Sequence, residues 1–257
     1  MRIHIRIEEQ ALERSLANIA ALFDEDAVVT AGPEAEADAE WTAAVDVSDV
    51  DGGVLARAVL TEAGGGEPLR AEQRRTVPED APDEERRAVR RQAAGAALLE
   101  ALERRTGIVQ PWGILTGVRP TKLLHDRNRR RISREATRRE LVELYRISEE
   151  KIALMERIVD RQLAVLPDLY ELKHEVSLYI GIPFCPTKCA YCTFPAYDIN
   201  GRQGSVDGFL RGLHEEMRLI GDWLRRSGVG VTTIYYGGGT PTSISAEEMD
   251  ALYALMY

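Results

Sequence analysis

The sequence has 257 residues, which is enough for one large domain or two ordinary ones. Hydrophobic residues make up 44% and charged residues 29%, so the chain can build a core and is not expected to be disordered. The formal charge of -9 argues against general binding to nucleic acid or to anionic membranes, which takes a basic excess. No apolar run reaches the roughly 18 residues of a bilayer span, and a signal-peptide pattern is absent, so a cytoplasmic protein is expected.

Residues 1–106 predict a small α+β module. Isoleucines alternate with polar residues at the start, and later segments show either this strand period or the three- and four-residue spacing of a helix. A long Ala/Leu helix is expected to end at Gly107, because glycine adopts the left-handed conformation easily. The predicted strands are 3–7, 41–47 and 54–61, and the predicted helices are 10–23 and 83–105.

Residues 107–172 predict a loop followed by a helical linker. Two prolines and two glycines interrupt the segment 111–122, which is expected to form an irregular loop. The segments 133–145 and 148–166 each begin with serine, a residue favoured at helix N-termini, and carry apolar residues at helical spacing. Two packed helices are therefore predicted here.

Residues 173–257 predict alternating strands and helices. Strands are expected at 176–182 and 231–236, and helices at 206–226 and from 246 onward. This order is typical of the start of a parallel α/β sheet or barrel. The last apolar stripe continues to Tyr257 without a stop signal, so we expect the helix to run to the last residue and the sequence to be truncated there.

All three cysteines of the sequence lie within eight residues, at Cys185, Cys189 and Cys192. An odd number this close together excludes a disulfide framework and favours metal or redox chemistry. Thiolates suit iron–sulfur clusters or zinc, and the charge of Lys188 would help to keep them deprotonated. Both centres take four ligands, so one position is left open. The alternative is a zinc site completed by His174 or another histidine.

Three glycines, Gly237 to Gly239, follow the second of these strands and precede Thr240. Glycine permits positive φ and close approach to a ligand, and parallel α/β folds bind ligands at the carboxyl ends of their strands. A tight turn between a strand and a helix would require the same residue types. The glycine run is therefore compatible with a ligand site and with a simple turn.

The spacing Cys185-x-x-x-Cys189-x-Tyr191-Cys192 resembles the signature of radical S-adenosylmethionine (SAM) enzymes. The resemblance implies that the three cysteines bind a [4Fe-4S] cluster whose fourth iron binds SAM. It also implies that reductive cleavage of SAM yields a radical that abstracts a hydrogen atom from the substrate. The implied fold is α/β, with the N-terminal module and helical linker followed by the first βα units of a partial (β/α) barrel.

The segment from Tyr179 to Cys185 and the glycine run are similar to those of the oxygen-independent coproporphyrinogen III dehydrogenase (oxidase) family. Gly181 and Phe194 replace a histidine and a cysteine of its well-studied branch, and the segment 115–122 is typical of a Gram-positive-type branch with an N-terminal extension. The resemblance implies SAM contacts by Tyr179, Tyr191, Gly238, Gly239 and Thr240.

Membership of this family would imply a heme-biosynthetic oxidoreductase. The implied reaction is the oxidative decarboxylation of coproporphyrinogen III to protoporphyrinogen IX, with a porphyrinogen substrate and an electron donor such as flavodoxin or ferredoxin. Neither nucleic acid nor a membrane is expected as a partner, no residue is assigned as catalytic, and whether the truncated chain is active alone is left open. The alternatives are a heme-binding chaperone of the same family and a zinc-stabilised interaction module.

Basic residues of the linker have two interpretations each. Arg119 and Lys122 could bind a porphyrinogen propionate, because a guanidinium matches a carboxylate well, or could only hold their loop. Seven arginines between 127 and 139 could form an RNA or substrate surface. The interleaved Glu135 and Glu140 favour a solvated helical face instead.

Overall fold

The computed structural model describes residues 3–24, 27–31, 39–117, 119–194, 196–201 and 204–256. The chain divides into two compact units, residues 1–167 and 168–257. Each unit combines helices with strands, so the mixed α/β class predicted from the sequence is confirmed. Within the described ranges, no helix combines the length and the hydrophobicity that crossing a membrane requires.

The first unit contains a five-stranded mixed sheet with the strand order β2-β1-β3-β4-β5. β1 pairs in parallel with β2 and β3, whereas β3 and β4, and β4 and β5, pair antiparallel. The three predicted strands are confirmed as β1, β3 and β4, while β2 and β5 were not predicted. The strands are β1 (Ile3–Ile7), β2 (Val28–Ala31), β3 (Trp41–Val50), β4 (Gly53–Glu62) and β5 (Leu69–Thr76).

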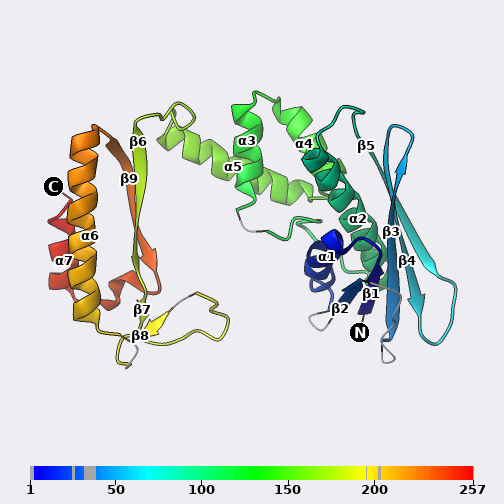
Figure 1. Ribbon diagram of the computed structural model, residues 1–257, viewed down its shortest axis with the longest axis horizontal. Coiled ribbons are helices and arrows are strands. Elements are labelled where there is room, and N and C mark those ends of the chain that lie inside the picture. The colour runs from blue at the N-terminus through cyan, green and yellow to red at the C-terminus, as the bar shows by residue number, and fades with distance from the viewer. Residues whose placement is uncertain are drawn as a thin grey trace. The chain divides into compact units, whose positions relative to one another are not determined.

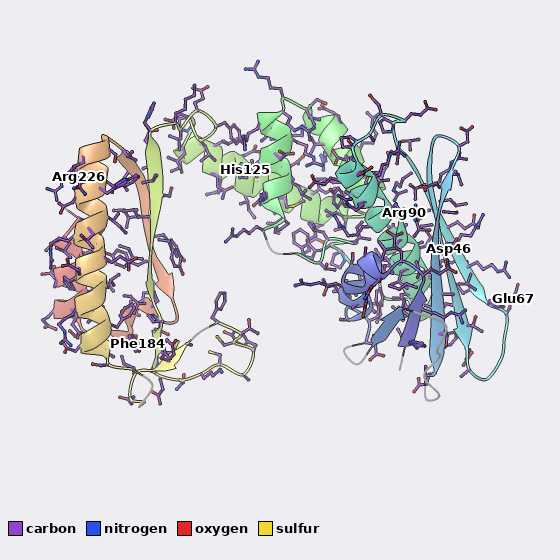
Figure 2. The ribbon with its side chains drawn as sticks, viewed as in Figure 1. Asp46, Glu67, Arg90, His125, Phe184 and Arg226 are labelled. Carbon is purple, nitrogen blue, oxygen red and sulfur yellow. The ribbon has the colours of Figure 1, made fainter. Side chains whose placement is uncertain are left out.

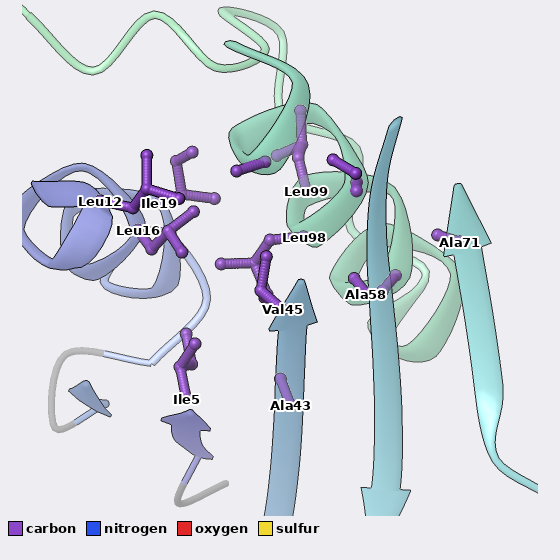
Figure 3. Packing of buried hydrophobic residues seen from close by; sticks show 14 of the residues in the cluster. Ile5, Leu12, Leu16, Ile19, Ala43, Val45, Ala58, Ala71, Leu98 and Leu99 are labelled. Carbon is purple, nitrogen blue, oxygen red and sulfur yellow. The ribbon is translucent and has the colours of Figure 1, made fainter. Parts of the chain in front are cut away.

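Two helices, α1 (Glu13–Ala20) and α2 (Asp83–Thr106), cover one face of this sheet, as Figures 1 and 3 show. A short 3-10 helix, η1 (Gln10–Leu12), precedes α1, so the predicted helix 10–23 is shorter and divided. Burying an aliphatic side chain contributes about 1.5–3 kcal/mol, so this interface is the main source of stability for the first unit. Its fully buried residues include Ile5, Leu16, Ile19, Leu60, Leu98, Leu99 and Leu102.

Helix α2 begins and ends as its charges and its glycine predict. Asp83 lies in the first turn, where a carboxylate interacts favourably with the helix dipole. Gly107 ends the helix with a left-handed φ of 72°. In between, Arg90, labelled in Figure 2, forms ion pairs with Glu9 at 2.8 Å and Asp49 at 2.9 Å. The hydrogen bond to Glu9 raises the pKa of Arg90 and joins α2 to the loop after β1.

Three helices follow in the first unit, α3 (Thr121–Arg129), α4 (Arg134–Glu143) and α5 (Glu149–Val165). The serines predicted to begin α4 and α5 do so, because the side chains of Ser133 and Ser148 accept hydrogen bonds from backbone N–H groups three residues later. Helix α3 was not predicted. The helices enclose a second core made of Leu124, Leu141, Ile147, Ile152, Met155 and Val159.

The second unit contains a parallel pair of strands, β6 and β9, with helices on one face (Figure 1). The predicted order of strand, helix, strand and helix is confirmed. A short parallel pair, β7 and β8, lies beyond the carboxyl end of β6. The elements are β6 (Glu175–Ile182), β7 (Phe184–Cys185), β8 (Tyr197–Asp198), α6 (Val206–Ser227), β9 (Gly230–Gly238), η2 (Pro241–Ser243) and α7 (Ala246–Tyr253).

Helix α7 ends at Tyr253, so the prediction that it runs to Tyr257 is wrong. Met256 packs back onto the second unit instead of extending the helix, whereas Leu255 is exposed. The sulfur of Met256 accepts a hydrogen bond from the hydroxyl of Tyr236 at 3.5 Å, and Met256 packs against the core cluster. Tyr257 itself lies outside the described residues.

Candidate functional site

The parallel register of β6 and β9 brings the cysteine segment and the glycine run together. Strand β6 leads into β7, which contains Cys185, and β9 ends in the glycine run. The backbone N–H of Gly239 donates to the carbonyl of Ile182 at 2.9 Å, and that of Thr240 donates to the carbonyl of Phe184 at 2.8 Å. Segments more than 50 residues apart in sequence therefore form one edge of the second unit. Figure 2 labels Phe184 at this edge.

The glycines of this run allow the two strands to approach each other closely. Gly238 has a φ of 107°, and a Cβ atom there would lie 2.5 Å from the carbonyl oxygen of Ile182. A Cβ atom on Gly239 would lie 2.7 Å from the sulfur of Cys185. The hydroxyl of Thr240 donates a hydrogen bond to the same sulfur at 3.4 Å. The run is thus more than a turn before α7, because it packs directly on the first cysteine.

The three cysteines are free thiols that share one loop but differ in their surroundings. Cys185 is half-buried in β7, and its carbonyl accepts a hydrogen bond from the backbone N–H of Ile199 at 3.0 Å. Cys189 is exposed and Cys192 half-buried, in a turn where the N–H of Cys192 donates to the carbonyl of Cys189. Over the parts of the chain that the structure describes, no three His, Cys, Asp or Glu side chains converge in a way that could hold a metal ion.

Tyr191 lies between the second and third cysteines and is 87% exposed. A hydrogen bond with Cys189 raises the pKa of the Tyr191 hydroxyl, and the charges of the Cys189 and Cys192 sulfurs raise it further. The Tyr191 hydroxyl and these two thiols therefore interact electrostatically. A ligand that approached the thiols would also meet the aromatic ring.

Tyr179 lies on the face of the strand pair opposite the helices, which we call the open face and define by Ser177, Tyr179, Gly181, Thr233, Tyr235 and Gly237. These residues form three register pairs across β6 and β9. The hydroxyls of Ser177 and Thr233 share a hydrogen bond of 2.8 Å, and the rings of Tyr179 and Tyr235 stack with centroids 5.6 Å apart. Tyr179 and Tyr235 remain 64% and 65% exposed, so the open face presents aromatic surface.

Two residues beside the site, Tyr235 and Gly237, were given no role from the sequence, although Gly237 was named as the first glycine of the run. The sequence did contain a signal for them, because side chains alternate along a strand and Tyr235 and Gly237, two residues apart on β9, lie on the same face. Their significance depends on the pairing of β9 with β6, which determines that Tyr235 lies opposite Tyr179.

The zinc site completed by His174 is not formed. His174 lies at the beginning of β6, where its carbonyl accepts a hydrogen bond from the N–H of Gly230. Cys185 lies beyond the other end of the same eight-residue strand. At about 3.3 Å per residue, the length of β6 alone separates them by more than roughly 20 Å.

The basic residues of the linker belong to the first unit. Arg119, which has a positive φ of 65°, and Lys122 are both exposed. Several of the arginines that follow pair with neighbouring carboxylates, as in the bonds of Arg134 to Asp160 and of Arg138 to Glu149. These ion pairs agree with a solvated helical face rather than an RNA surface.

Comparison with known proteins gives three informative relatives, although no protein-family model matches the chain. The chain is 48% identical over all of its 257 residues to the oxygen-independent coproporphyrinogen-III oxidase-like protein HemZ of Bacillus subtilis, and covers 50% of it. It is 42% identical over 76 residues to the heme chaperone HemW of Bacillus subtilis, covering 30% of this chain and 19% of HemW. It is 35% identical over 91 residues to the oxygen-independent coproporphyrinogen III oxidase of Pseudomonas aeruginosa, covering 35% of this chain and 19% of that protein.

These relatives identify the class of protein that the chain resembles, because all three are members of the radical SAM family. Within that family it is similar to proteins named as coproporphyrinogen oxidases, as oxidase-like proteins and as heme chaperones. The resemblance drawn from Cys185, Cys189 and Cys192 and from the glycine run is therefore confirmed. The chain spans half the length of HemZ and about a fifth of the other two relatives.

Proposed function

We propose that the second unit is the beginning of a partial (β/α) radical SAM barrel. In this arrangement residues 1–106 are the N-terminal α+β module, 107–172 the loop and helical linker, and 173–257 the first βα units. The parallel pairing of β6 with β9 and the placement of α6 and α7 on one face support this proposal. In such a barrel the open face would line the interior.

The cysteine loop has the donor chemistry of a [4Fe-4S] site. Cys185, Cys189 and Cys192 would hold three irons, since thiolates are the usual protein ligands of these clusters. The fourth iron would be left for SAM. The close approach of Gly239 to the Cys185 sulfur supports this assignment, because any larger residue would fill the space beside the proposed ligand. When bound, the cluster would supply the electron that cleaves SAM and begins radical chemistry.

The chain's own residues would bind and orient SAM. Gly238 and Gly239 would let the backbone approach the ligand, because neither carries a side chain. Thr240 would hold the first cysteine in place through its hydroxyl. Tyr179, before the cysteine segment, and Tyr191, within it, would present exposed rings, and aromatic faces attract cations such as a sulfonium.

The proposed reaction is the oxygen-independent oxidative decarboxylation of coproporphyrinogen III to protoporphyrinogen IX. The substrate would be a porphyrinogen, and flavodoxin or ferredoxin would supply electrons. The single observation that carries the proposal is the contact of the glycine run with Cys185, which unites the two segments on which the resemblance rests. The 48% identity to HemZ along the whole chain supports the assignment to a heme-related oxidoreductase.

A second candidate function is heme binding by a chaperone. The 42% identity to HemW over 76 residues favours it, because a protein named as a heme chaperone shares part of this sequence. The oxidase and the chaperone would use the same cluster and SAM residues and would differ in what they do with a tetrapyrrole.

Anaerobic incubation separates the two functions. The chain, reconstituted with iron and sulfide, is incubated with coproporphyrinogen III, SAM and a reductant, and in parallel with heme. The oxidase proposal expects vinyl products by chromatography and mass spectrometry, and it expects none from Cys189→Ala, a change at an exposed position. Stable heme capture without turnover would favour the chaperone. The absence of both vinyl product and heme capture would contradict both functions.

A further inference from the structure

The ring of Tyr179 lies over a floor made of two glycines. A Cβ atom on Gly237 would lie 2.5 Å from the Tyr179 hydroxyl oxygen and 2.8 Å from the ring carbons Cε2 and Cζ. A Cβ atom on Gly181 would lie 3.2 Å from Cε1 of the same ring. The two glycines are register partners on β6 and β9, so together they leave one continuous space that the ring occupies. Gly237 is buried and Gly181 is half-buried, although Tyr179 and Tyr235 on the same face are exposed.

Tyr235 holds the same ring from the side. It is the register partner of Tyr179, and the two rings stack with centroids 5.6 Å apart and an interplanar angle of 22°. Stacked aromatic pairs at this distance attract each other beyond the effect of area burial. The ring of Tyr179 is therefore packed against the two glycines and against the ring of Tyr235, while 64% of the residue stays exposed for a ligand.

We propose that Tyr235 and Gly237 are positioning residues that fix the ring of Tyr179 for SAM binding. The first glycine of the run thus serves the tyrosine, whereas Gly238 and Gly239 pack against Ile182 and Cys185. Neither Tyr235 nor Gly237 has to touch the ligand. The inference rests on the proposed function in one respect, which is that SAM is the ligand that Tyr179 contacts.

The first experiment observes the ring without any cofactor. The full chain carries fluorotyrosine at position 179, and its fluorine NMR resonance is compared among variants. Tyr235→Leu removes the stacked ring, and Gly237→Ala displaces Tyr179 at little cost to the fold, because the obstructed atoms are the far end of a side chain. Both variants should shift the resonance, whereas Tyr235→Phe should retain its position. Gly212→Ala in α6, where a Cβ atom would meet nothing within 4 Å, is the matched control.

The second experiment measures SAM affinity of the reconstituted chain by the change in its paramagnetic spectrum. Tyr235→Leu and Gly237→Ala should weaken SAM binding by about two- to tenfold, and Tyr235→Phe should restore it. An unmoved resonance in both variants, or a moved resonance with unchanged SAM affinity, would overturn the inference while the wild-type chain still binds SAM. If the wild-type chain binds no SAM, the proposed function fails and the inference fails with it.

Discussion

Cys185 is held by the fold more firmly than the other two cysteines. It lies in β7, its carbonyl is bonded to the N–H of Ile199, and its sulfur accepts the hydroxyl of Thr240. Cys189 and Cys192 lie in the following turn. We therefore expect Cys185 to anchor a bound cluster and the rest of the loop to close around it.

Replacing Thr240 by valine should lower the reduction potential of the cluster. A hydrogen bond to a sulfur ligand stabilises the more negative, reduced state, and such bonds tune cluster potentials. One hydrogen bond of about 1 kcal/mol corresponds to roughly 40 mV for one electron. A redox titration followed by electron paramagnetic resonance measures the shift. Thr240→Ser keeps the hydroxyl and should keep the potential, and equal potentials for wild type and Thr240→Val would show that the bond is not made to the cluster ligand.

Which residues meet at the site could be predicted in part. Two strands joined by a helix usually pair in parallel, and the cysteine segment and the glycine run each follow one of the two predicted strands. The contact between Thr240 and Cys185 could not be predicted, because it depends on the exact register. An irregularity between Val176 and Ser177 shifts the pairing of β6 with β9, and hydrophobic periodicity does not reveal such a shift.

At the scale of elements, β9 is the strand whose end determines the geometry of the site. Its last residue, Gly238, combines a φ of 107° with a close approach to the backbone of Ile182. Both features exclude a side chain, because the obstructed atoms belong to the rigid strand β6. The parallel pair is therefore sensitive to substitution at this point.

Gly238→Ala should destabilise the pairing of β6 with β9 by about 1–3 kcal/mol, the cost of a residue held in unfavourable backbone geometry. Hydrogen exchange measured by mass spectrometry should show faster exchange in peptides from β6 and β9. The control Gly212→Ala, on a helix and without obstruction, should be neutral or stabilising. Equal exchange protection in wild type and Gly238→Ala would contradict the close packing described for this strand end.

The helices and strands whose sequences show strong hydrophobic periodicity were predicted. The failure to predict the others has physical reasons. Strand β5 is an edge strand in which Ala71 alone is buried, so its sequence lacks an apolar alternation. Helix α3 begins directly after Pro120, a residue read as a loop signal although proline is tolerated at a helix start. Helix α7 ends at Tyr253, and Met256 beyond it packs against the core, a tertiary contact that local sequence does not reveal.

At the scale of the whole molecule, each compact unit has its own hydrophobic core. The first unit has two core clusters, one under the mixed sheet and one among α3, α4 and α5. The second unit has a smaller cluster between the strand pair and its helices. The larger buried clusters of the first unit make it the main contributor to stability, whereas the chemistry proposed for the protein belongs to the second unit.

Leu98→Ala should lower the free energy of unfolding of the first unit by about 2–5 kcal/mol. Leu98 is fully buried in α2, so the change removes packed methyl groups and leaves a cavity. Urea unfolding followed by circular dichroism measures the loss. Leu219→Ala, at a position that is 59% exposed, should change stability by less than about 0.5 kcal/mol, and equal losses in both variants would contradict the assigned core.

Three thiols of the second unit would hold a cluster with one iron open to SAM. The most direct measurement is electron paramagnetic resonance of the full chain, reconstituted and reduced without oxygen, before and after addition of SAM. We expect about four irons and four sulfides per chain, lost in Cys192→Ala, and a spectrum that changes when SAM is added. A cluster whose spectrum SAM leaves unaltered, or a chain that retains no iron, would contradict it.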